Sequence, residues 1–380
     1  MDFSLTDEQS LLRESLSRFL RDRYSFEERT AATHSPQGWR PDIWNSFVHE
    51  LGIVALGVPE AAGGVGGGAV EHMIVMEELG RALVLEPYLE TAIIGAGLAS
   101  RFDTPAARNL LGAIVAGEAV TAFAWAEPEM RYDPADIGCS ARQDADSWVL
   151  NGAKAVVAAA PWATHFLVAA RTAGERGDLA GLSLFIVPRD TAGLQILNYP
   201  TIDGRRASDL IFSDVTIGQD ALLGEAGSAH AIVAETIDRA IAGLCAEAVG
   251  VMDHMLQDTI AYTKERRQFG QALADFQVLQ HRMVDMFMKI EMARSATYLV
   301  TLRLDADAAT RARAASAAKY MVGEAARFVG QNAVQLHGGM GMTDELALGH
   351  FFKRATVIES EFGTGQDHLD RHAELTRNAA

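Results

Sequence analysis

Apolar residues in the first third of the chain recur at helical spacing. In the stretch "SLTDEQSLLRESLSRFLRDR", Leu12 and Leu16 lie on one face of a predicted helix. Thr6 and Gln9, three residues apart just before this apolar run, form the pattern of a capping box. A second stretch, "GGAVEHMIVMEELGRAL", also gathers its apolar residues on one helical face. We therefore expect a helical domain over residues 1–117.

The hydrophobic period changes near residue 118. Short runs such as "TAFAWAEP", "SWVLNGAKAVV" and "LSLFIVP" are rich in aromatic and β-branched residues, and Gly, Pro and Asp separate them at intervals of roughly ten residues. No pattern of helical length alternates with these runs, so a parallel Rossmann sheet is disfavoured. The sequence predicts an antiparallel β-barrel or sandwich domain over residues 118–227.

The remaining residues, 228–380, return to helical spacing. Three long stretches rich in Ala and Met contain few helix breakers, and such helices usually form an antiparallel bundle. The expected fold class is therefore α+β, mostly α, with a helical domain, a β-domain and a bundle of four-helix type in that order.

Composition and charge narrow the classes of function. A chain of 380 residues is long for a single core, which agrees with several domains. The net charge of −17 argues against a nucleic-acid partner. Cys139 and Cys245 belong to no Cys-x-x-Cys pair, so neither a disulfide framework nor a metal site is expected. The start lacks a signal-peptide pattern, and no apolar stretch is long enough for a bilayer, so we expect a cytoplasmic protein without a membrane partner.

Five short motifs carry a resemblance to a known family. They are "VPEAAGGVG" at 58–66, "AEP" at 126–128, "LNGAK" at 150–154, "RRQFGQALADFQVLQHRMVDM" at 266–286 and "AVQLHGGMGM" at 333–342. Together and in this order they resemble the flavin-dependent acyl-CoA dehydrogenases. The chain is most similar to the small subunit of two-subunit bacterial enzymes, such as pimeloyl-CoA dehydrogenase and the dehydrogenases of steroid side-chain degradation.

The resemblance implies an activity, a cofactor and partners. These enzymes act in β-oxidation and related lipid metabolism: a carboxylate removes the α-proton of an acyl-CoA, and the flavin of FAD accepts the β-hydride. An electron-transfer flavoprotein is the implied electron acceptor. In the family a neighbouring subunit holds the ADP half of FAD. The residues that match FAD contacts of the family are Arg266, Gln268, Phe269, Gln335, Gly338, Gly339, Thr364 and Gln366.

The catalytic base of the family pattern is replaced. Where the family has Tyr-Glu-Gly-Thr, the sequence reads Glu-Phe-Gly-Thr, so Phe362 stands in place of the base, and we expect Glu361 to turn away. A minority of the family places the base on the first bundle helix, where Glu247 is the candidate. Its apolar neighbours suggest a buried carboxylate with a raised pKa. The alternative is a structural Glu paired with an arginine, in a network with Asp238 and Arg239.

Residues that would contact the flavin ring are also replaced. Ala126, Val156 and Ala158 stand where the family has side chains that cradle the ring, and none of them offers a side-chain hydrogen bond. Arg131, Tyr132 and Asp133 replace a usual Gly-Ser-Asp. Groups for the ADP end of FAD are thus retained, whereas groups for the ring and the base are absent.

Three interpretations follow. The chain is the largely non-catalytic partner in a heterotetramer and donates ADP-side contacts to the FAD of a second acyl-CoA dehydrogenase-like subunit. The first alternative is a self-sufficient homo-oligomer with Glu247 as the base. The second is a non-enzymatic paralogue that binds acyl-CoA or serves assembly. Steroid side-chain and dicarboxylyl thioesters are the substrates that the resemblance suggests.

Overall fold

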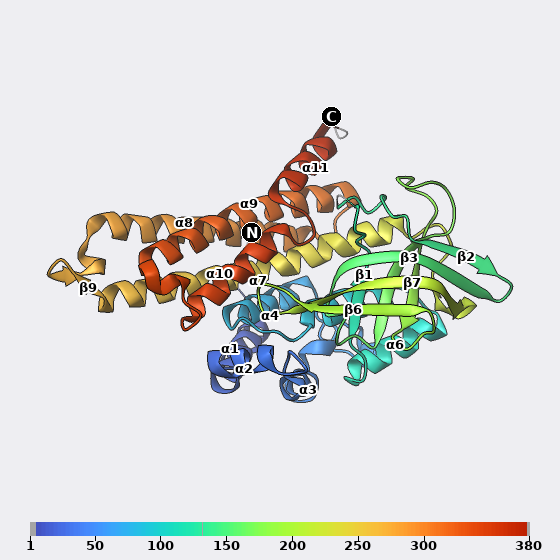
Figure 1. Ribbon diagram of the computed structural model, residues 1–380, viewed down its shortest axis with the longest axis horizontal. Helices are drawn as coiled ribbons and strands as arrows, with labels where there is room; N and C mark the ends of the chain where they lie inside the picture. The colour runs from blue at the N-terminus through green and yellow to red at the C-terminus, as the bar shows by residue number, and fades with distance from the viewer. Residues whose placement is uncertain (1–4, 131, 378–380) are drawn as a thin grey trace.

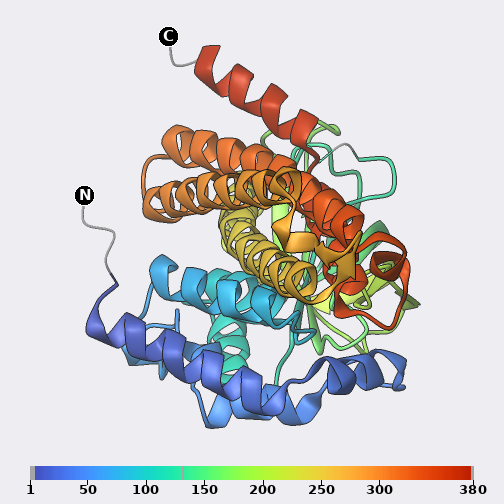
Figure 2. The same cartoon turned by 90° about the vertical axis from the view of Figure 1, so that its left-hand side faces the viewer.

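The computed structural model describes residues 5–130 and 132–377, so Arg131 lies outside the described residues. Helices of the N-terminal third lie beneath a long helical bundle, and the β-sheet packs at one end of that bundle (Figure 1). Seen from the end of the bundle, α11 lies on the opposite side from the N-terminal helices (Figure 2). The three predicted parts thus appear in the expected order and form the expected mostly helical α+β fold.

The N-terminal part is helical, as predicted. Its helices are α1 (Asp7–Arg23), α2 (Phe26–His34), α3 (Pro41–His49), α4 (Ala69–Arg81), a π-helix (Leu89–Gly95), α5 (Ala96–Ala99) and α6 (Pro105–Val115). The capping box is confirmed, because the Gln9 N–H donates to Thr6 Oγ1 at 3.2 Å and the Thr6 N–H donates to Gln9 Oε1 at 3.1 Å. The second predicted helix is α4, which packs against the bundle.

The middle part is one sheet of eight strands in the order β6-β7-β3-β2-β4-β5-β8, with β1 beside β4. The strands are β1 (Thr121–Ala124), β2 (Ser140–Asp144), β3 (Ser147–Ala158), β4 (His165–Arg171), β5 (Leu182–Pro188), β6 (Leu194–Pro200), β7 (Arg206–Gly218) and β8 (Leu222–Leu223). Most pairs are antiparallel, as predicted, whereas β1 and β2 pair with β4 in parallel. Within the described chain β6 and β8 do not pair with each other, so the sheet is open rather than a closed barrel.

The C-terminal part contains the long helices that the sequence predicts. They are α7 (His230–Glu265), α8 (Gln277–Arg303), α9 (Ala308–His337), α10 (Ala347–Ser360) and α11 (Gly365–Arg377), and a small hairpin of β9 (Arg267–Gln268) and β10 (Gln271–Ala272) joins α7 to α8. Helix α7 is the central helix, since it packs on α4, α8, α9 and α10. In the two described ranges, no helix is both long and apolar enough to cross a bilayer.

Glycines bring α4 and α7 into close contact. A Cβ atom at Gly80 would lie 2.1 Å from the Glu247 carbonyl oxygen, and one at Gly250 would lie 1.9 Å from the Glu77 carbonyl oxygen. This close approach fixes Glu247 at the junction of the N-terminal part and the bundle. The two cysteines, Cys139 and Cys245, are both free and buried.

Candidate functional site

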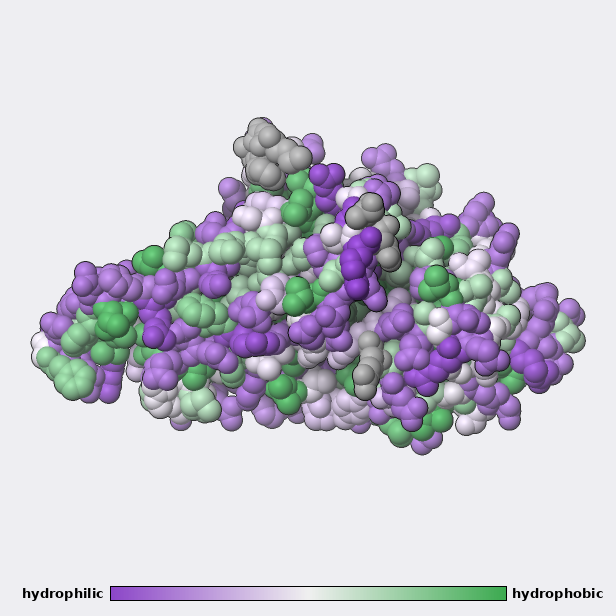
Figure 3. All heavy atoms as spheres, turned by 90° about the horizontal axis from the view of Figure 1, so that it is seen from above, coloured by the Kyte–Doolittle hydropathy of each residue, from purple (hydrophilic) through white to green (hydrophobic). Residues whose placement is uncertain are grey.

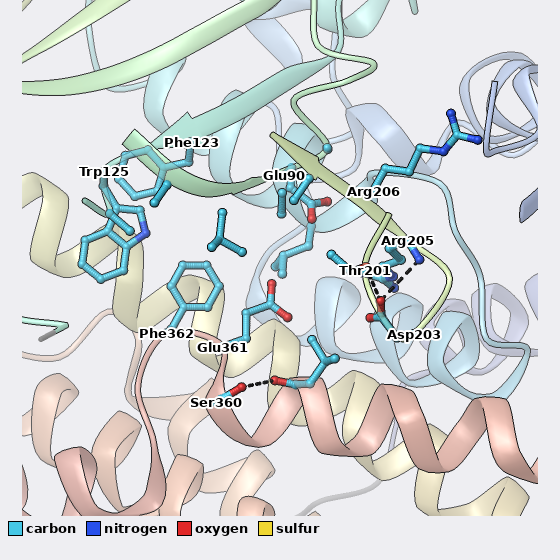
Figure 4. Close-up of a pocket in the computed structure, with 18 of the residues that line it drawn as sticks. Glu90, Phe123, Trp125, Thr201, Asp203, Arg205, Arg206, Ser360, Glu361 and Phe362 are labelled. Carbon is cyan, nitrogen blue, oxygen red and sulfur yellow. Dashed lines mark hydrogen bonds between the residues drawn. The ribbon is translucent and has the colours of Figure 1, made fainter. Parts of the chain in front are cut away.

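A cavity of about 360 Å³ lies where the N-terminal helices, the sheet and the bundle meet. Its apolar lining comes from the π-helix, β1 and β3, and its charged lining from the β6–β7 connection and the end of α10. The residues drawn and labelled in Figure 4 are Glu90, Phe123, Trp125, Thr201, Asp203, Arg205, Arg206, Ser360, Glu361 and Phe362. Aromatic rings lie on one side, arginines lie on the other, and two glutamates point into the space between them (Figure 4).

Three aromatic rings form the apolar side of the cavity. Trp125 and Phe362 stack with 6.1 Å between ring centroids and 7° between ring planes, although they come from distant segments. Phe123 also stacks on Trp125, with 6.4 Å between ring centroids. These separations are normal for aromatic pairs in direct contact, so Trp125 and Phe362 leave no slot for a further planar ring between them.

The turn after α10 brings both Glu361 and Phe362 into the cavity. Helix α10 ends at Ser360, Glu361 is extended, and Phe362 has φ of 59°, in the left-handed region that bulky residues rarely adopt. Lys319 on α9 stabilises the turn, because its Nζ donates to the Gly363 carbonyl at 2.8 Å. The expectation that Glu361 turns away is wrong: the left-handed residue reverses the chain, so the two consecutive side chains face the same cavity.

Glu247 lies behind this cavity in a buried ion cluster. Arg354 donates to its two oxygens through Nε and Nη2, each at 2.7 Å, and Arg205 Nη2 donates to Oε1 at 2.7 Å. Glu247 is 1% exposed, and Arg205 and Arg354 line the cavity in front of it. Burial alone would raise the pKa of Glu247, but the charges of Arg205 and Arg354 outweigh burial and hold it below its usual value. The predicted raised pKa is therefore wrong.

Among the described residues, Glu247 does not share an ion-pair network with Asp238 and Arg239, as the alternative interpretation expected. Asp238 pairs with Arg311 and Arg371, while Arg239 pairs with Glu235. Glu247 instead joins Asp203 and Glu361 around Arg354, whose Nη1 donates to Asp203 at 2.9 Å and to Glu361 at 3.2 Å. The arginine partners of Glu247 thus come from the β6–β7 connection and α10, which sequence proximity on α7 could not reveal.

Glu90 is a site residue that the sequence reasoning missed. It lies in the π-helix and lines the cavity, and its side chain is 6% exposed. Its Oε2 atom has no hydrogen-bond partner among the described residues. Burial raises the pKa of Glu90 to about 7, with Arg205 lowering it and Glu361 raising it. A charged residue within the otherwise apolar "LETAIIGAGLA" run was the available sequence signal.

Four of the predicted FAD contacts meet at the other end of the bundle. Arg266, Gln335, Gly338 and Gly339 line one open hollow of about 870 Å³ between the ends of α7, α8 and α9. A Cβ atom at either glycine would meet nothing within 4 Å, so the backbone there is open to a ligand.

Gln268 and Phe269 lie on the neighbouring hairpin. Both are exposed, and Phe269 is 91% exposed. In Figure 3 apolar side chains gather at the tip of the bundle, where this hairpin lies.

Thr364 and Gln366 form a second group, at the start of α11. The Thr364 hydroxyl donates to Asp367, and the Gln366 amide donates to Asp370 at 2.9 Å. The turn before Thr364 contacts Lys319 on α9, whereas Gln335 is 16 residues further along that helix, or roughly 24 Å at about 1.5 Å per residue. The structure therefore separates the eight predicted contacts into two distant groups.

Comparison with known proteins identifies the family. Three family models match consecutive parts of the chain: the N-terminal domain of acyl-CoA dehydrogenase over residues 6–118, its middle domain over 122–215 and its C-terminal domain over 230–375. The chain belongs to the acyl-CoA dehydrogenase family. Members of this family are FAD-dependent oxidoreductases that act on CH–CH bonds, so the resemblance seen in the sequence and the cofactor that it implied are confirmed.

Known proteins match this chain over most of its length and most of their own. The probable acyl-CoA dehydrogenase FadE25 of Mycobacterium tuberculosis is 31% identical over 84% of this chain and 83% of its own. The butyryl-CoA dehydrogenase of Megasphaera elsdenii has a TM-score of 0.89 at 26% identity, covering 98% of this chain and 99% of its own. A variant of the Tcur3481-Tcur3483 steroid acyl-CoA dehydrogenase has a TM-score of 0.89 at 28% identity, covering 98% of both chains.

The cavity of this acyl-CoA dehydrogenase-like chain does not fit the ring of FAD. A flavin ring needs donors for its carbonyl and ring-nitrogen acceptors. The side chains of Ala126, Val156 and Ala158 supply none, and the Val156 N–H already donates to Asp209 at 3.0 Å. The carboxylates of Glu90 and Glu361 present further acceptors instead. The hollow at the tip is different, because Arg266 and Gln335 offer donors suited to phosphate and adenosine groups.

Proposed function

We propose that this chain is the partner subunit of a two-chain, FAD-dependent acyl-CoA dehydrogenase, and that it donates contacts to the ADP half of a flavin whose ring lies in the other subunit. The observation that carries the proposal is the contrast between the two ends of the bundle. Donors and open glycine backbone meet in the hollow at the tip, whereas Ala126, Val156 and Ala158, at the ring positions of the other cavity, offer no side-chain donor.

The contacts in the hollow suit the diphosphate of FAD. Arg266 follows the last residue of α7 and lines the hollow, and its guanidinium offers forked donors for phosphate oxygens. The exposed Gly338 and Gly339 allow a ligand to approach the backbone. Because the hollow opens outward at the tip, the remainder of such a cofactor would extend onto a neighbouring chain.

Exposed apolar residues on the bundle also support an assembled state. Helix α8 carries a run of half-exposed apolar residues at helical spacing, namely Val284, Phe287, Met288, Met292, Leu299 and Leu302. An apolar stripe of this kind on a soluble domain usually marks a contact with another chain. The solved Tcur3481-Tcur3483 enzyme, whose name joins two proteins, supports a two-chain arrangement for this chain too.

An acyl-CoA is the expected substrate of the assembly. We extend the proposal to thioesters of bulky acyl groups, such as steroid side-chain or dicarboxylyl thioesters, and to an electron-transfer flavoprotein as the acceptor. Support comes from the resemblance to the two-subunit enzymes. A cytoplasmic location follows from the same proposal.

The test is the FAD content of the chain alone and with its partner. The second acyl-CoA dehydrogenase-like chain should be sought first in the neighbouring open reading frame and then co-expressed. We expect about one FAD per pair of chains, and its loss when Arg266 is replaced by Ala. One FAD per chain in the isolated protein would overturn the proposal. A pair that never binds flavin would favour the non-enzymatic alternative.

A self-sufficient enzyme is the second candidate, and one observation favours it. Glu361 faces the cavity beside the position where the family places its base, so this chain has a carboxylate near that place. Glu247, which the sequence suggested for this role, is held by two arginines behind the cavity wall. Turnover by the isolated chain that is lost in Glu361→Gln, but retained in Glu247→Gln, would establish this candidate with Glu361 as the base.

A further inference from the structure

We propose that the cavity at the junction of the three parts binds a small organic ammonium ion, whose charged group lies between Glu90 and Glu361 beside the rings of Trp125 and Phe362. The inference rests on the proposed function in one respect, because it requires a cavity that holds no flavin ring. It assigns this cavity a ligand of its own.

One carboxylate of the cavity, that of Glu90, is not bonded to any of the three described arginines that line it. Arg205 donates to Glu247 and to the Val84 carbonyl, and Arg206 donates to the Ser35 and Pro36 carbonyls. Arg354 is bound to Glu247, Asp203 and Glu361. The arginines are thus bonded to other protein groups, and the Oε2 atom of Glu90 has no hydrogen-bond partner among the described residues.

Glu90 lines the cavity, and the absence of a hydrogen bond to its buried Oε2 atom among the described residues indicates a missing partner. A buried carboxylate oxygen without a hydrogen bond is costly, and such exceptions in folded proteins usually have a functional explanation. The carboxylate projects from a π-helix, a distortion that is frequent at functional sites. In Figure 4 Glu90 and Glu361 point toward the same space from opposite sides. A donor placed there would contact both.

The aromatic side of the cavity favours a cation. Trp125, Phe123 and Phe362 are stacked, and the negative faces of aromatic rings attract ammonium groups. Leu85, Leu89 and Ile94 supply an apolar surface for the body of the ligand. A cavity of about 360 Å³ accommodates a small molecule. The ligand class is therefore a primary or secondary amine with a short apolar chain.

Three probes of one chain length test the charge preference. Hexylammonium, hexanol and hexanoate differ only in the head group, and calorimetric titration of the flavin-free chain at pH 8 gives an affinity for each. We expect hexylammonium to bind about 10- to 100-fold more tightly than hexanol, as a hydrogen-bonded charge pair implies. Hexanoate should bind most weakly, because two carboxylates face it.

Variants of the two glutamates test whether hexylammonium binds at the proposed residues. Glu90→Gln and Glu361→Gln keep the shape of the side chain and should each weaken hexylammonium binding at least tenfold. Glu129→Gln is the control, since Glu129 is an exposed carboxylate that does not line the cavity but directly precedes Met130 of the cavity wall in the sequence. This variant should bind as the original chain does.

Several results would overturn the inference. Hexanoate that binds as tightly as hexylammonium would mean that the arginines dominate the cavity. Absence of binding by all three probes, or hexylammonium binding that survives both glutamine variants, would also reject it. The amine titration uses flavin-free protein, whereas the proposed function is tested by the FAD content of the two-chain assembly. Absence of amine binding would therefore reject this inference without changing the result for the proposed function.

Discussion

Arg354 holds Glu247 through two hydrogen bonds of 2.7 Å, and both side chains are almost completely buried. Arg354 reaches from α10 and Glu247 from α7, so the pair ties two helices of the bundle together. Arg205 adds a third connection from the β-domain. The cluster therefore joins the parts that enclose the cavity.

Breaking this pair should destabilise the fold. Glu247→Gln removes the charge that balances Arg354 and Arg205, and uncompensated buried charges of this kind cost about 3–5 kcal/mol. The free energy of unfolding from urea titration measures the loss. Arg108→Ala, which removes a surface ion pair with Asp103, is the control and should change stability little. Unchanged stability in Glu247→Gln would contradict a structural role and reopen the role of base.

Glu90 should make stability fall as pH rises. Burial raises its pKa to about 7 in the folded chain, where Arg205, Glu361 and Arg354 face it. The folded state then binds more protons than the unfolded state between about pH 4.3 and pH 7. The cost of ionising Glu90 is absent below this window and complete above it, where it amounts to about 4 kcal/mol.

The measurement compares Glu90→Gln with the original chain at pH 4 and pH 8. The variant should be the more stable protein at pH 8 and differ little at pH 4, because glutamine carries no charge to bury. An equal difference at both pH values would show that Glu90 does not titrate in this window.

Arg266 should matter for flavin and not for folding. Arg266→Ala in the two-chain assembly should weaken FAD binding about 10- to 100-fold, because charge-assisted hydrogen bonds to phosphate are lost. The neighbouring exposed Arg267 provides a control, since it does not line the hollow. Equilibrium dialysis with FAD and a melting curve of the apo-assembly measure the two effects. Equal losses in both variants would point to a general charge effect.

Gly80 should be indispensable for the contact of α4 with α7. Gly80→Ala places a Cβ atom 2.1 Å from the Glu247 carbonyl oxygen, so the helices must separate, and overpacking of this kind costs about 1–3 kcal/mol or more. Gly112→Ala in α6 is a matched control, because its Cβ atom meets nothing within 4 Å. Alanine in an open helix position should stabilise by about 0.5–1 kcal/mol. Two variants of equal stability would contradict the close packing.

Much of the fold could be predicted from local pattern. The helical and strand periods located the three parts, and the Thr6–Gln9 capping box marked the start of α1. The openness of the sheet and the parallel β1–β4 pair could not be predicted, because strand order depends on contacts between distant segments. Short motifs likewise revealed the family, since its cofactor contacts require particular residue types at fixed spacing.

The site was predicted less completely. The sequence by itself determined that Phe362 replaces an acidic residue and that Arg266 and Gln335 are present. Only the tertiary structure decided that Glu361 faces the cavity, because this depends on the left-handed φ of Phe362. The tertiary structure also decided which arginines bind Glu247 and that the Oε2 atom of Glu90 has no hydrogen-bond partner among the described residues. The charges that act on both carboxylates come from segments that meet only when the chain folds.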